Sequence, residues 1–438
     1  MSPVESRGLG NGPSARFVSR APRVRAYAVA GVLLVTGVAC FHGGEVVSSP
    51  ASREPPARKS TPSSAPSGQC RDEFEPVRAP GVPSIDTVLS DVTSLSATDA
   101  WAVGFVGSAS AAPALAGQAD DALILHWDGA RWSRIDAPYN VRSDLSSRLN
   151  QIGYLTAVSG ASPGDVWAVG YPGLLIEHWD SKRWSIARSA DIDAVGDSGA
   201  LTGVTVLAPD DVWAVGGSSQ PSDPGPVALH WDGTSWRKVA MAPHDDEEGV
   251  LSVAAAGPDD IWASGAAGQL RMHAPIAEHW DGQYWIKVPL PFPSSAKWYS
   301  LLRLAASGPD DVWIVGHSKT GKNARRQPFA VHFNGERWET VSIRLSDGMV
   351  GGELEDVATR SEGDVWMVGS QLSADGISHA AVWHRVGGEW TTPALGGPLA
   401  RSDLRGLAAS EDGEVWLVGR LRGTGQTSRA MVGRRVCP

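Results

Sequence analysis

Large apolar residues along the chain recur in short alternating runs, the period of β-strands, and not at helical spacing. One phrase repeats: Leu-x-x-Val, a turn, Val-Trp-x-Val-Gly, a variable stretch, then apolar-x-His-Trp-Asp-Gly-x-x-Trp. Nine residues before the first Trp of each copy stands a Val or Leu, which indicates that the two segments form one rigid unit. The first Trp of each copy stands at Trp101, Trp167, Trp213, Trp262, Trp313, Trp366 and Trp416.

Each copy divides into four strands. The first is like residues 155–160, the second like 165–170, the third like 227–231, and the fourth begins at a Trp such as Trp236. Asp-Gly or Asn-Gly between strands three and four supplies the positive φ angles of a tight hairpin. Four antiparallel strands in a unit of about fifty residues define a propeller blade. The sequence therefore predicts an all-β fold, a seven-bladed β-propeller with four antiparallel strands per blade.

The repeat over residues 89–438 resembles the kelch repeat of galactose-oxidase-type propellers, because Val-Trp-x-Val-Gly is followed by Asp-Gly and Trp. It departs from that repeat in having paired glycines after strand two only at Gly216-Gly217. The Val-Trp and Gly-x-x-Trp phrases also resemble tectonin-type lectin repeats, which are shorter. The first resemblance implies a propeller, and the second implies carbohydrate binding.

The seventh copy ends after its third strand, near residues 429–436. Residues 72–79 have the pattern of a fourth strand, with Phe74 in place of the Trp. We expect this N-terminal strand to pair with strand three of the last blade and to close the ring. Alignment of blade seven on blade six places Cys70 and Cys437 together at the position of the hairpin turn. The sequence therefore predicts a Cys70–Cys437 disulfide in place of two free thiols.

Residues 1–39 have the pattern of a signal peptide: an Arg-rich start and then an uncharged, mostly apolar run too short to span a bilayer. The run stops at Cys40, which resembles a bacterial lipoprotein signal and implies lipidation of that thiol. Ordinary cleavage after Ala39 is the alternative, and both export the protein. Residues 40–69, rich in Ser and Pro, are expected to be a disordered tether, and residues 70–438 the propeller. We expect a membrane-anchored lipoprotein of the bacterial cell envelope, or a secreted protein.

Composition and motifs narrow the function classes. The formal net charge is −10, which argues against general nucleic-acid binding. The sequence contains no Asp-box, nucleophile elbow or phosphate loop, and no Tyr and Cys set suited to a galactose-oxidase-like copper site. We therefore predict no enzymatic activity, no metal and no cofactor.

Each of the first six copies carries a His six residues before its fourth-strand Trp and an acid two residues before its second-strand Trp. Strand two starts and strand three ends at the same face, so each acid and His should be neighbours. Recurrence in every blade favours a structural hydrogen bond over a triad or metal site, which would occur once. The repeated Trp residues are likewise expected to pack between blades and not to serve as sugar platforms. The clearest candidate pairs are Asp165–His178, Asp211–His230, Asp260–His279 and Asp311–His332.

Most length variation lies in the loops that follow strands two and four, which share one face. Variable loops on a rigid scaffold commonly bind partners, although such loops can also be merely solvated. The candidate binding residues are Tyr139, His244, Trp298, His317, Lys319, Arg325 and Arg326. The innermost strands add charges near the axis, expected to line a water-filled channel: Asp91, Arg303, Glu355, Asp356 and Arg405.

These observations predict a monomeric, non-enzymatic binding or scaffold propeller, anchored at the surface through Cys40, that holds an unknown protein or glycan at its loop-rich face. A lectin-like propeller is one alternative, and it would repeat aromatic-lined pockets between blades. A propeller enzyme acting on glycans is the other. A tight cluster of unlike polar groups at the loop-rich mouth would indicate that enzyme.

Overall fold

The computed structural model describes residues 70–81, 86–107, 119–138, 153–244, 248–267, 275–292, 295–296, 298–321, 323–422 and 427–435. The chain divides into two units, Met1–Ala65 and Pro66–Pro438. The predicted signal peptide, Cys40 and the tether lie outside the described residues, so these assignments stay predictions. No helix within the described ranges is both long and apolar enough to cross a membrane.

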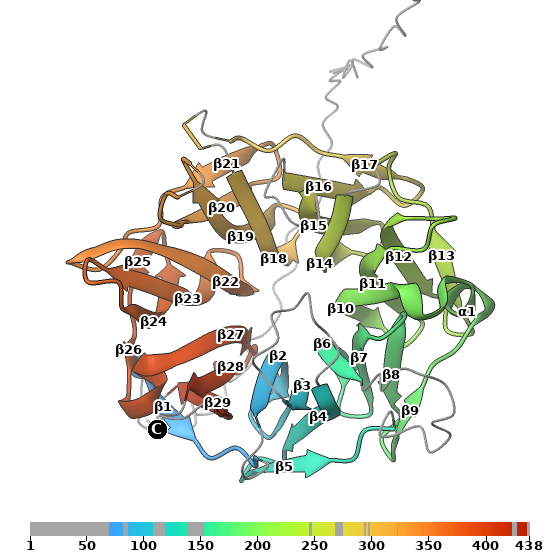
Figure 1. Cartoon of the computed structure of the whole chain (residues 1–438), viewed down its shortest axis with the longest axis horizontal. Coiled ribbons are helices and arrows are strands. Elements are labelled where there is room, and N and C mark those ends of the chain that lie inside the picture. The colour runs from blue at the N-terminus through green and yellow to red at the C-terminus, as the bar shows by residue number, and fades with distance from the viewer. Residues whose placement is uncertain are drawn as a thin grey trace, which may run out of the picture. The chain divides into compact units, whose positions relative to one another are not determined.

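Seven sheets surround a common axis, which confirms the predicted seven-bladed β-propeller (Figure 1). In six of them, four consecutive strands pair antiparallel from the axis outwards. Blade one consists of β2 (Thr87–Ser96), β3 (Asp99–Gly107), β4 (Ala119–Trp127) and β5 (Trp132–Ile135). Blade two consists of β6 (Tyr154–Ser162), β7 (Asp165–Tyr171), β8 (Leu175–Trp179) and β9 (Trp184–Ile186). Blade three consists of β10 (Gly199–Ala208), β11 (Asp211–Ser218), β12 (Gly225–Trp231) and β13 (Trp236–Val239).

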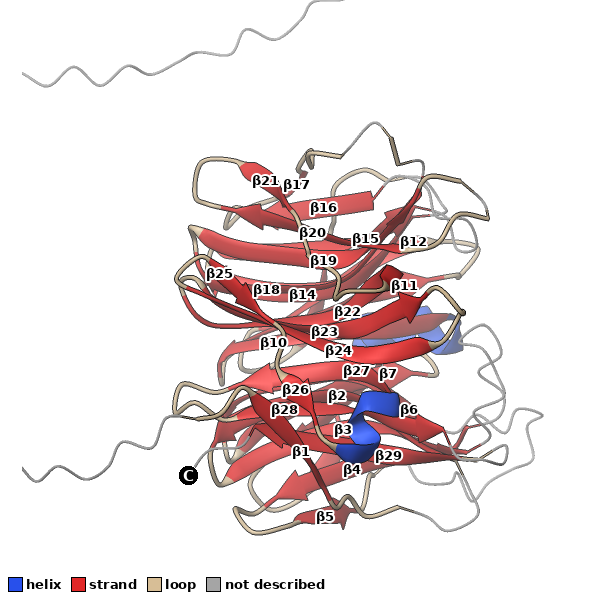
Figure 2. Ribbon diagram, turned by 90° about the vertical axis from the view of Figure 1, so that its left-hand side faces the viewer, coloured by secondary structure: helices blue, strands red, loops and turns tan. Residues whose placement is uncertain are grey.

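The next three blades follow the same order. They are β14 (Glu248–Gly257), β15 (Asp260–Ala267), β16 (Pro275–Trp280) and β17 (Trp285–Lys287); β18 (Trp298–Gly308), β19 (Asp311–Lys319), β20 (Gln327–Phe333) and β21 (Trp338–Val341); and β22 (Met349–Ser361), β23 (Asp364–Ser373), β24 (Ser378–Val386) and β25 (Glu389–Thr391). Strands make up most of the described chain (Figure 2). The helical segments are short: α1 (Ala190–Val195) and the 3₁₀ turns Gly196–Ser198 and Gly397–Arg401.

The seventh blade is closed by the N-terminal strand, as predicted. Strand β1 (Glu73–Val77) pairs antiparallel with β29 (Ser428–Arg435), which continues to β28 (Val415–Arg422) and β27 (Ser402–Ala409). A fifth strand, β26 (Ala394–Leu395), pairs with the outer edge of β1, so the closing strand is held on both sides. The last register pair joins Phe74 to Arg435. Cys437 lies outside the described residues, so its disulfide with Cys70 stays a prediction.

Neighbouring blades are joined through the repeated Trp residues. The strand-two Trp of each blade is at most 4 % exposed and meets, edge to face, the strand-four ring of the next blade. The centroids of these rings lie 5.1–6.4 Å apart. Phe74 supplies this ring to Trp366 and is fully buried, so the closing strand reproduces the contact that every other blade makes. Trp383 lies outside the repeat positions; it is buried and donates from Nε1 to the Arg344 carbonyl.

Candidate functional site

The innermost strand of every blade contains a β-bulge at the same place. Where strand one pairs with strand two, one residue of strand one is left out of the register. This residue directly follows the first apolar residue of the Leu-x-x-Val phrase, for example between Leu201 and Gly203. The extra residue is unpaired and the strand bends there, so its side chain is turned toward the axis. We call the seven skipped residues the bulge ring: Ser90, Thr156, Thr202, Leu251, Leu302, Glu355 and Arg405.

The Gly of each Val-Trp-x-Val-Gly phrase makes room for the bulge. A Cβ at any of these glycines would lie 1.8–2.0 Å from a strand-one carbonyl oxygen, well inside van der Waals contact. The two halves of the repeated phrase are therefore coupled, because the bulge in strand one requires Gly at the facing position of strand two. These glycines are Gly104, Gly170, Gly216, Gly265, Gly316, Gly369 and Gly419.

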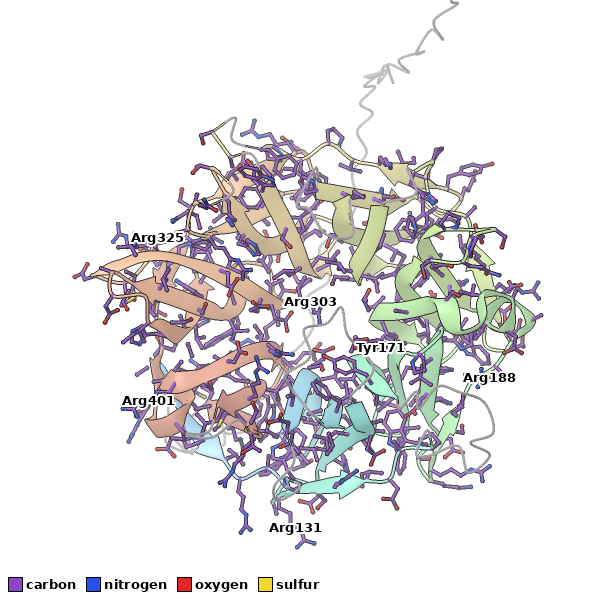
Figure 3. The ribbon with its side chains drawn as sticks, in the orientation of Figure 1. Arg131, Tyr171, Arg188, Arg303, Arg325 and Arg401 are labelled. Carbon is purple, nitrogen blue, oxygen red and sulfur yellow. The ribbon has the colours of Figure 1, made fainter. Side chains whose placement is uncertain are left out.

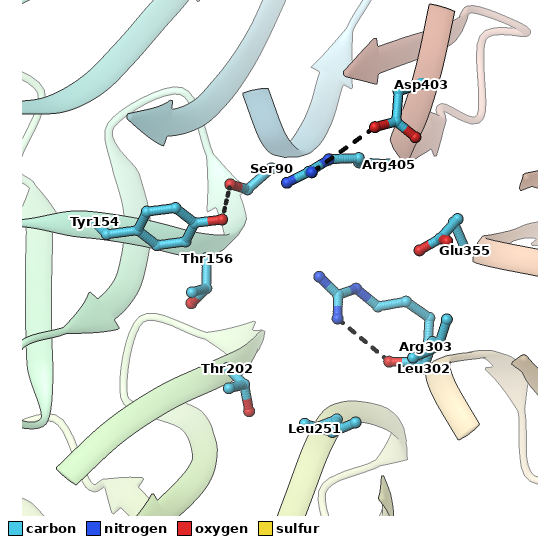
Figure 4. A pocket seen from close by; sticks show the side chains of 10 residues that line it. All are labelled: Ser90, Tyr154, Thr156, Thr202, Leu251, Leu302, Arg303, Glu355, Asp403 and Arg405. Carbon is cyan, nitrogen blue, oxygen red and sulfur yellow. Dashed lines mark hydrogen bonds and ion pairs between the residues drawn. The ribbon is translucent and has the colours of Figure 1, made fainter. Parts of the chain in front are cut away.

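The bulge ring lines a cavity of about 400 Å³ on the axis, together with Tyr154, Arg303 and Asp403 (Figure 4). The ring is chemically asymmetric. Blades one to three contribute hydroxyls, blades four and five contribute the two Leu side chains, and blades six and seven contribute Glu355 and Arg405. We call this space the axial cavity. A chamber of this size with apolar and polar walls is typical of a small-ligand or side-chain site.

Tyr154 lines the axial cavity and packs against two other aromatic rings. Its ring centroid lies 4.4 Å from that of Phe105 and 4.8 Å from that of Tyr171. The Ser90 hydroxyl donates to the Tyr154 oxygen at 3.3 Å. Burial raises the pKa of Tyr171 above its usual range. This aromatic stack braces the cavity wall.

Charged groups gather where blades five, six and seven meet. Asp403 accepts from Arg420 Nε at 2.8 Å and lies 3.9 Å from Arg405 Nη2. Arg303 donates from Nη1 to the Leu302 carbonyl at 3.2 Å. Burial, followed by repulsion from the Glu353 and Asp403 carboxylates, raises the pKa of Glu355 to about 7. This carboxyl group therefore changes charge near neutral pH.

Asp91 and Asp356, predicted to line the channel, instead tie the blades together. Each accepts the backbone N–H of its own following residue at 2.9 Å and an N–H of the next blade, from Val158 at 2.9 Å and Leu407 at 2.8 Å. Burial, followed by repulsion from Asp91, raises the pKa of Asp356 to about 7. Of the five predicted axial charges, Arg303, Glu355 and Arg405 line the cavity, and these two carboxylates do not.

The structure brings each predicted acid and His together. The carboxylate oxygen and His Nε2 are 2.7 Å apart in Asp165–His178, Asp260–His279 and Asp311–His332, and 2.9 Å apart in Asp211–His230. Each of these His rings also stacks on the strand-two Trp of its own blade, with centroids 4.0–4.4 Å apart. In blade seven Arg434 takes the place of the His and donates to Glu414 at 2.6 Å. Each pair thus holds a His ring against the Trp that joins two blades, an arrangement that stabilises the fold.

Four of the predicted loop residues, Trp298, His317, Lys319 and Arg326, lie near one another on blade five, whereas His244 lies apart, after β13. Tyr139 lies outside the described residues. His244 is half-buried, with its ring nitrogens 3.2 and 3.5 Å from the Ala242 and Pro224 carbonyl oxygens. Trp298 and Lys319 are strand residues that pair with each other in β18 and β19. Arg325 and Arg326 are exposed, and Arg326 forms an ion pair with Glu353.

The structure corrects the prediction that His317 belongs to a variable loop. His317 lies in β19, is 5 % exposed, and has its Nδ1 3.9 Å from the Glu353 carboxylate. The hairpin continues through Ser318, which pairs with Gln327, so the strand runs past the point where the polar residues suggested a loop. Burial, and then the positive charge of Arg326, lower the pKa of His317 to about 4.

Sequence reasoning missed most of the bulge ring, although the repeat contains its signal. The Leu and Val of Leu-x-x-Val are three residues apart and both face the core, as Leu201 and Val204 do. In a regular strand, residues three apart point to opposite faces. The spacing therefore requires an extra residue between them. No cluster of His, Cys, Asp and Glu in the described part of the chain could hold a metal ion.

No family model matches the chain, and no curated protein matches it. Solved structures of similar fold include YCF48 bound to a D1 peptide, with a TM-score of 0.52, 15 % identity, and coverage of 86 % of this chain and 100 % of that chain. YCF48 from Cyanidioschyzon merolae has a TM-score of 0.51 and 12 % identity, covering 83 % and 98 %. An inactive virginiamycin B lyase from Staphylococcus aureus with quinupristin has a TM-score of 0.50 and 11 % identity, covering 82 % and 99 %. At these identities the chain shares a propeller fold with them, and the kelch and tectonin resemblances remain resemblances of motif.

Proposed function

We propose that this protein is an exported, surface-anchored binding propeller that holds a segment of a partner protein in its axial cavity. The observation that carries the proposal is the bulge ring. Seven equivalent positions bear unlike residues that include hydroxyls, two Leu side chains, a Glu and an Arg, around a cavity of about 400 Å³. Repeats that only close the ring have no need to differ in this way. The half-buried acid–His pairs, in contrast, recur with little change.

A peptide fits this cavity better than a stacked sugar does. Lectin-like binding through the repeat would need open aromatic faces, and the strand-two Trp residues are at most 4 % exposed. Tyr154, the aromatic residue of the cavity wall, already packs against the rings of Phe105 and Tyr171. Leu251 and Leu302 offer an apolar wall for an aliphatic side chain, while the hydroxyls and charged groups offer partners for peptide polar atoms. Export and anchoring rest on the signal sequence and Cys40.

A cavity-filling variant tests the proposal. The exported protein and its Leu251→Trp variant are used to capture partners from envelope extracts. The matched control is Ile286→Trp, which adds the same ring to the outer strand of the same blade, where the side chain is 49 % exposed. We expect a partner that binds the native protein and the control and is lost with Leu251→Trp. A partner retained by Leu251→Trp, with the variant folded by its melting curve, would place binding elsewhere.

An enzyme acting on acidic glycans is the second candidate, and one observation favours it. Glu355, Asp403, Tyr154 and two Arg side chains face the same cavity, and a carboxyl group with a pKa of about 7 is suited to transfer a proton. Incubation with a panel of uronate-containing polysaccharides, followed by measurement of new reducing ends, tests this candidate. Turnover abolished by Glu355→Gln would support the enzyme, and no turnover by the native protein would exclude it for that panel.

A further inference from the structure

We propose that the axial cavity binds a carboxylate of the partner peptide between Arg303 and Arg405, and that binding takes up at most one proton, at Glu355. The inference rests on the proposed function and adds the chemistry of the ligand and its dependence on pH. Its starting point is the arrangement of three side chains from three neighbouring blades around one cavity.

Two guanidinium groups face the cavity from either side of Glu355. Arg303 comes from β18 in blade five and Arg405 from β27 in blade seven, and both extend toward the middle of the cavity (Figure 4). In the whole ring, Arg303 points to the centre, whereas Arg131 and Arg325 lie at the outer edge (Figure 3). Guanidinium groups bind carboxylates through charge-assisted hydrogen bonds, and a pair of them repels a cationic ligand.

The opposite wall supplies a further donor. Ser90 donates its proton to the Tyr154 oxygen, which leaves the Tyr154 hydroxyl proton free to be donated to a ligand. Thr156 and Thr202, in contrast, donate to the backbone carbonyls of Leu201 and Val250 at 2.8 and 3.0 Å. The donors that face the cavity are thus well suited to a ligand group that only accepts hydrogen bonds.

The other acids around the cavity already have partners. Glu353 forms an ion pair with Arg326, and Asp403 accepts from Arg420. Asp356 accepts two backbone N–H groups and lies 4.0 Å from Arg303 Nε. Within the described residues, Glu355 accepts no hydrogen bond and forms no ion pair within 4 Å. Asp356 also has a raised pKa, but each of its two carboxylate oxygens accepts a backbone N–H, so Glu355 is the acid on this wall that is free to donate to a ligand.

The sign of the pH dependence follows from charge. An anion held by Arg303 and Arg405 repels the ionised form of Glu355, so binding raises the pKa of this carboxyl above its free value of about 7. The neutral acid can then donate its O–H to a ligand oxygen. Affinity is full below about pH 7 and falls as pH rises between the free and the bound pKa values, by at most about tenfold per pH unit.

Calorimetric titration of the full exported chain tests the proposal. The probes are acetylated tripeptide libraries with a free C-terminal carboxylate, the same libraries as C-terminal amides, amides with an internal Glu, and sodium acetate. We expect binding only of probes that carry a carboxylate, and the arms distinguish a chain end, a side chain and a small free anion as its source. Measurement from pH 6 to pH 9 gives the proton uptake.

Three variants separate this proposal from a structural effect. Arg405→Gln should weaken the binding of carboxylate probes at least about tenfold. Arg131→Gln changes an exposed Arg at the ring edge and should leave their affinity unchanged. Glu355→Gln keeps a neutral hydrogen-bonding side chain, so binding should persist and lose its pH dependence. Melting curves establish that each variant is folded.

Several results would overturn the inference: equal affinity for acids and amides, an unchanged pH slope in Glu355→Gln, or no binding of any carboxylate probe at millimolar concentration. The captured partner distinguishes the two levels of proposal. If Arg405→Gln retains that partner and Leu251→Trp loses it, the carboxylate inference fails and the proposed function stands. If Leu251→Trp also retains it, both fail.

Discussion

The glycine that faces each bulge should be among the least replaceable residues of the fold, and blade three offers a matched pair. A Cβ on Gly216 would lie 2.0 Å from the Ala200 carbonyl oxygen and 2.8 Å from the Leu201 Cα. Contacts below about 3 Å are not tolerated, so β10 would have to move by about 1 Å or give up its bulge. We expect Gly216→Ala to lower the free energy of unfolding by about 3 kcal/mol or more.

The neighbouring Gly217 is the control. A Cβ there would lie 3.6 Å from the Gly225 carbonyl oxygen, an ordinary contact, and Gly217 has no left-handed conformation. Gly217→Ala should therefore be neutral or stabilise by up to about 1 kcal/mol, through the entropy of the unfolded chain. Urea unfolding of the full chain, followed by Trp fluorescence, measures both variants. Equal effects of the two substitutions, or a cost below about 0.5 kcal/mol for Gly216→Ala, would refute the coupling between glycine and bulge.

Three further predictions concern stability. Phe74→Ala removes a fully buried ring from the closing strand and should cost about 3–5 kcal/mol in unfolding measurements; an unchanged melting temperature would mean that this strand does not secure the ring. Cys70→Ser should lower stability by at most about 5 kcal/mol under oxidising conditions, and a reductant should bring the native protein to the same value if Cys437 is its partner. Because the pKa of His317 is lowered to about 4, the unfolded chain takes up its proton first, so the native protein should lose stability as pH falls from about 6.5 toward 4, by about 2 kcal/mol at pH 5. His317→Leu should remove this loss, and an unchanged pH profile in that variant would contradict it.

The architecture could be predicted from the sequence because the same strand pattern occurs seven times. The spacing between Val and Trp, the turn residues and the fourth-strand Trp together specified blades of four strands, and the pattern around Phe74 identified the closing strand. Such local patterns can be recognised in a single sequence because each blade is built from contacts within itself and with its neighbours.

Only part of the axial cavity could be predicted from the sequence, and the reason is physical. Period-2 alternation assigns a side chain to a face only while the strand is regular, and each innermost strand breaks that rule at its bulge. Thr202 and Leu251 looked like ordinary strand residues, although they share a wall with Arg303. His317 shows the opposite error. A polar residue next to basic ones suggested a loop, but the backbone there continues as a paired strand.

Photo-cross-linking in the exporting cell tests most directly whether the axial cavity is the binding site. Benzoyl-phenylalanine is placed at Leu302 in the bulge ring and, as a control, at Tyr284, whose side chain is 68 % exposed at the outer edge of blade four. We expect a specific cross-linked partner from position 302 and none from position 284. Cross-linking from 284, with none from 302 in a folded protein, would contradict it.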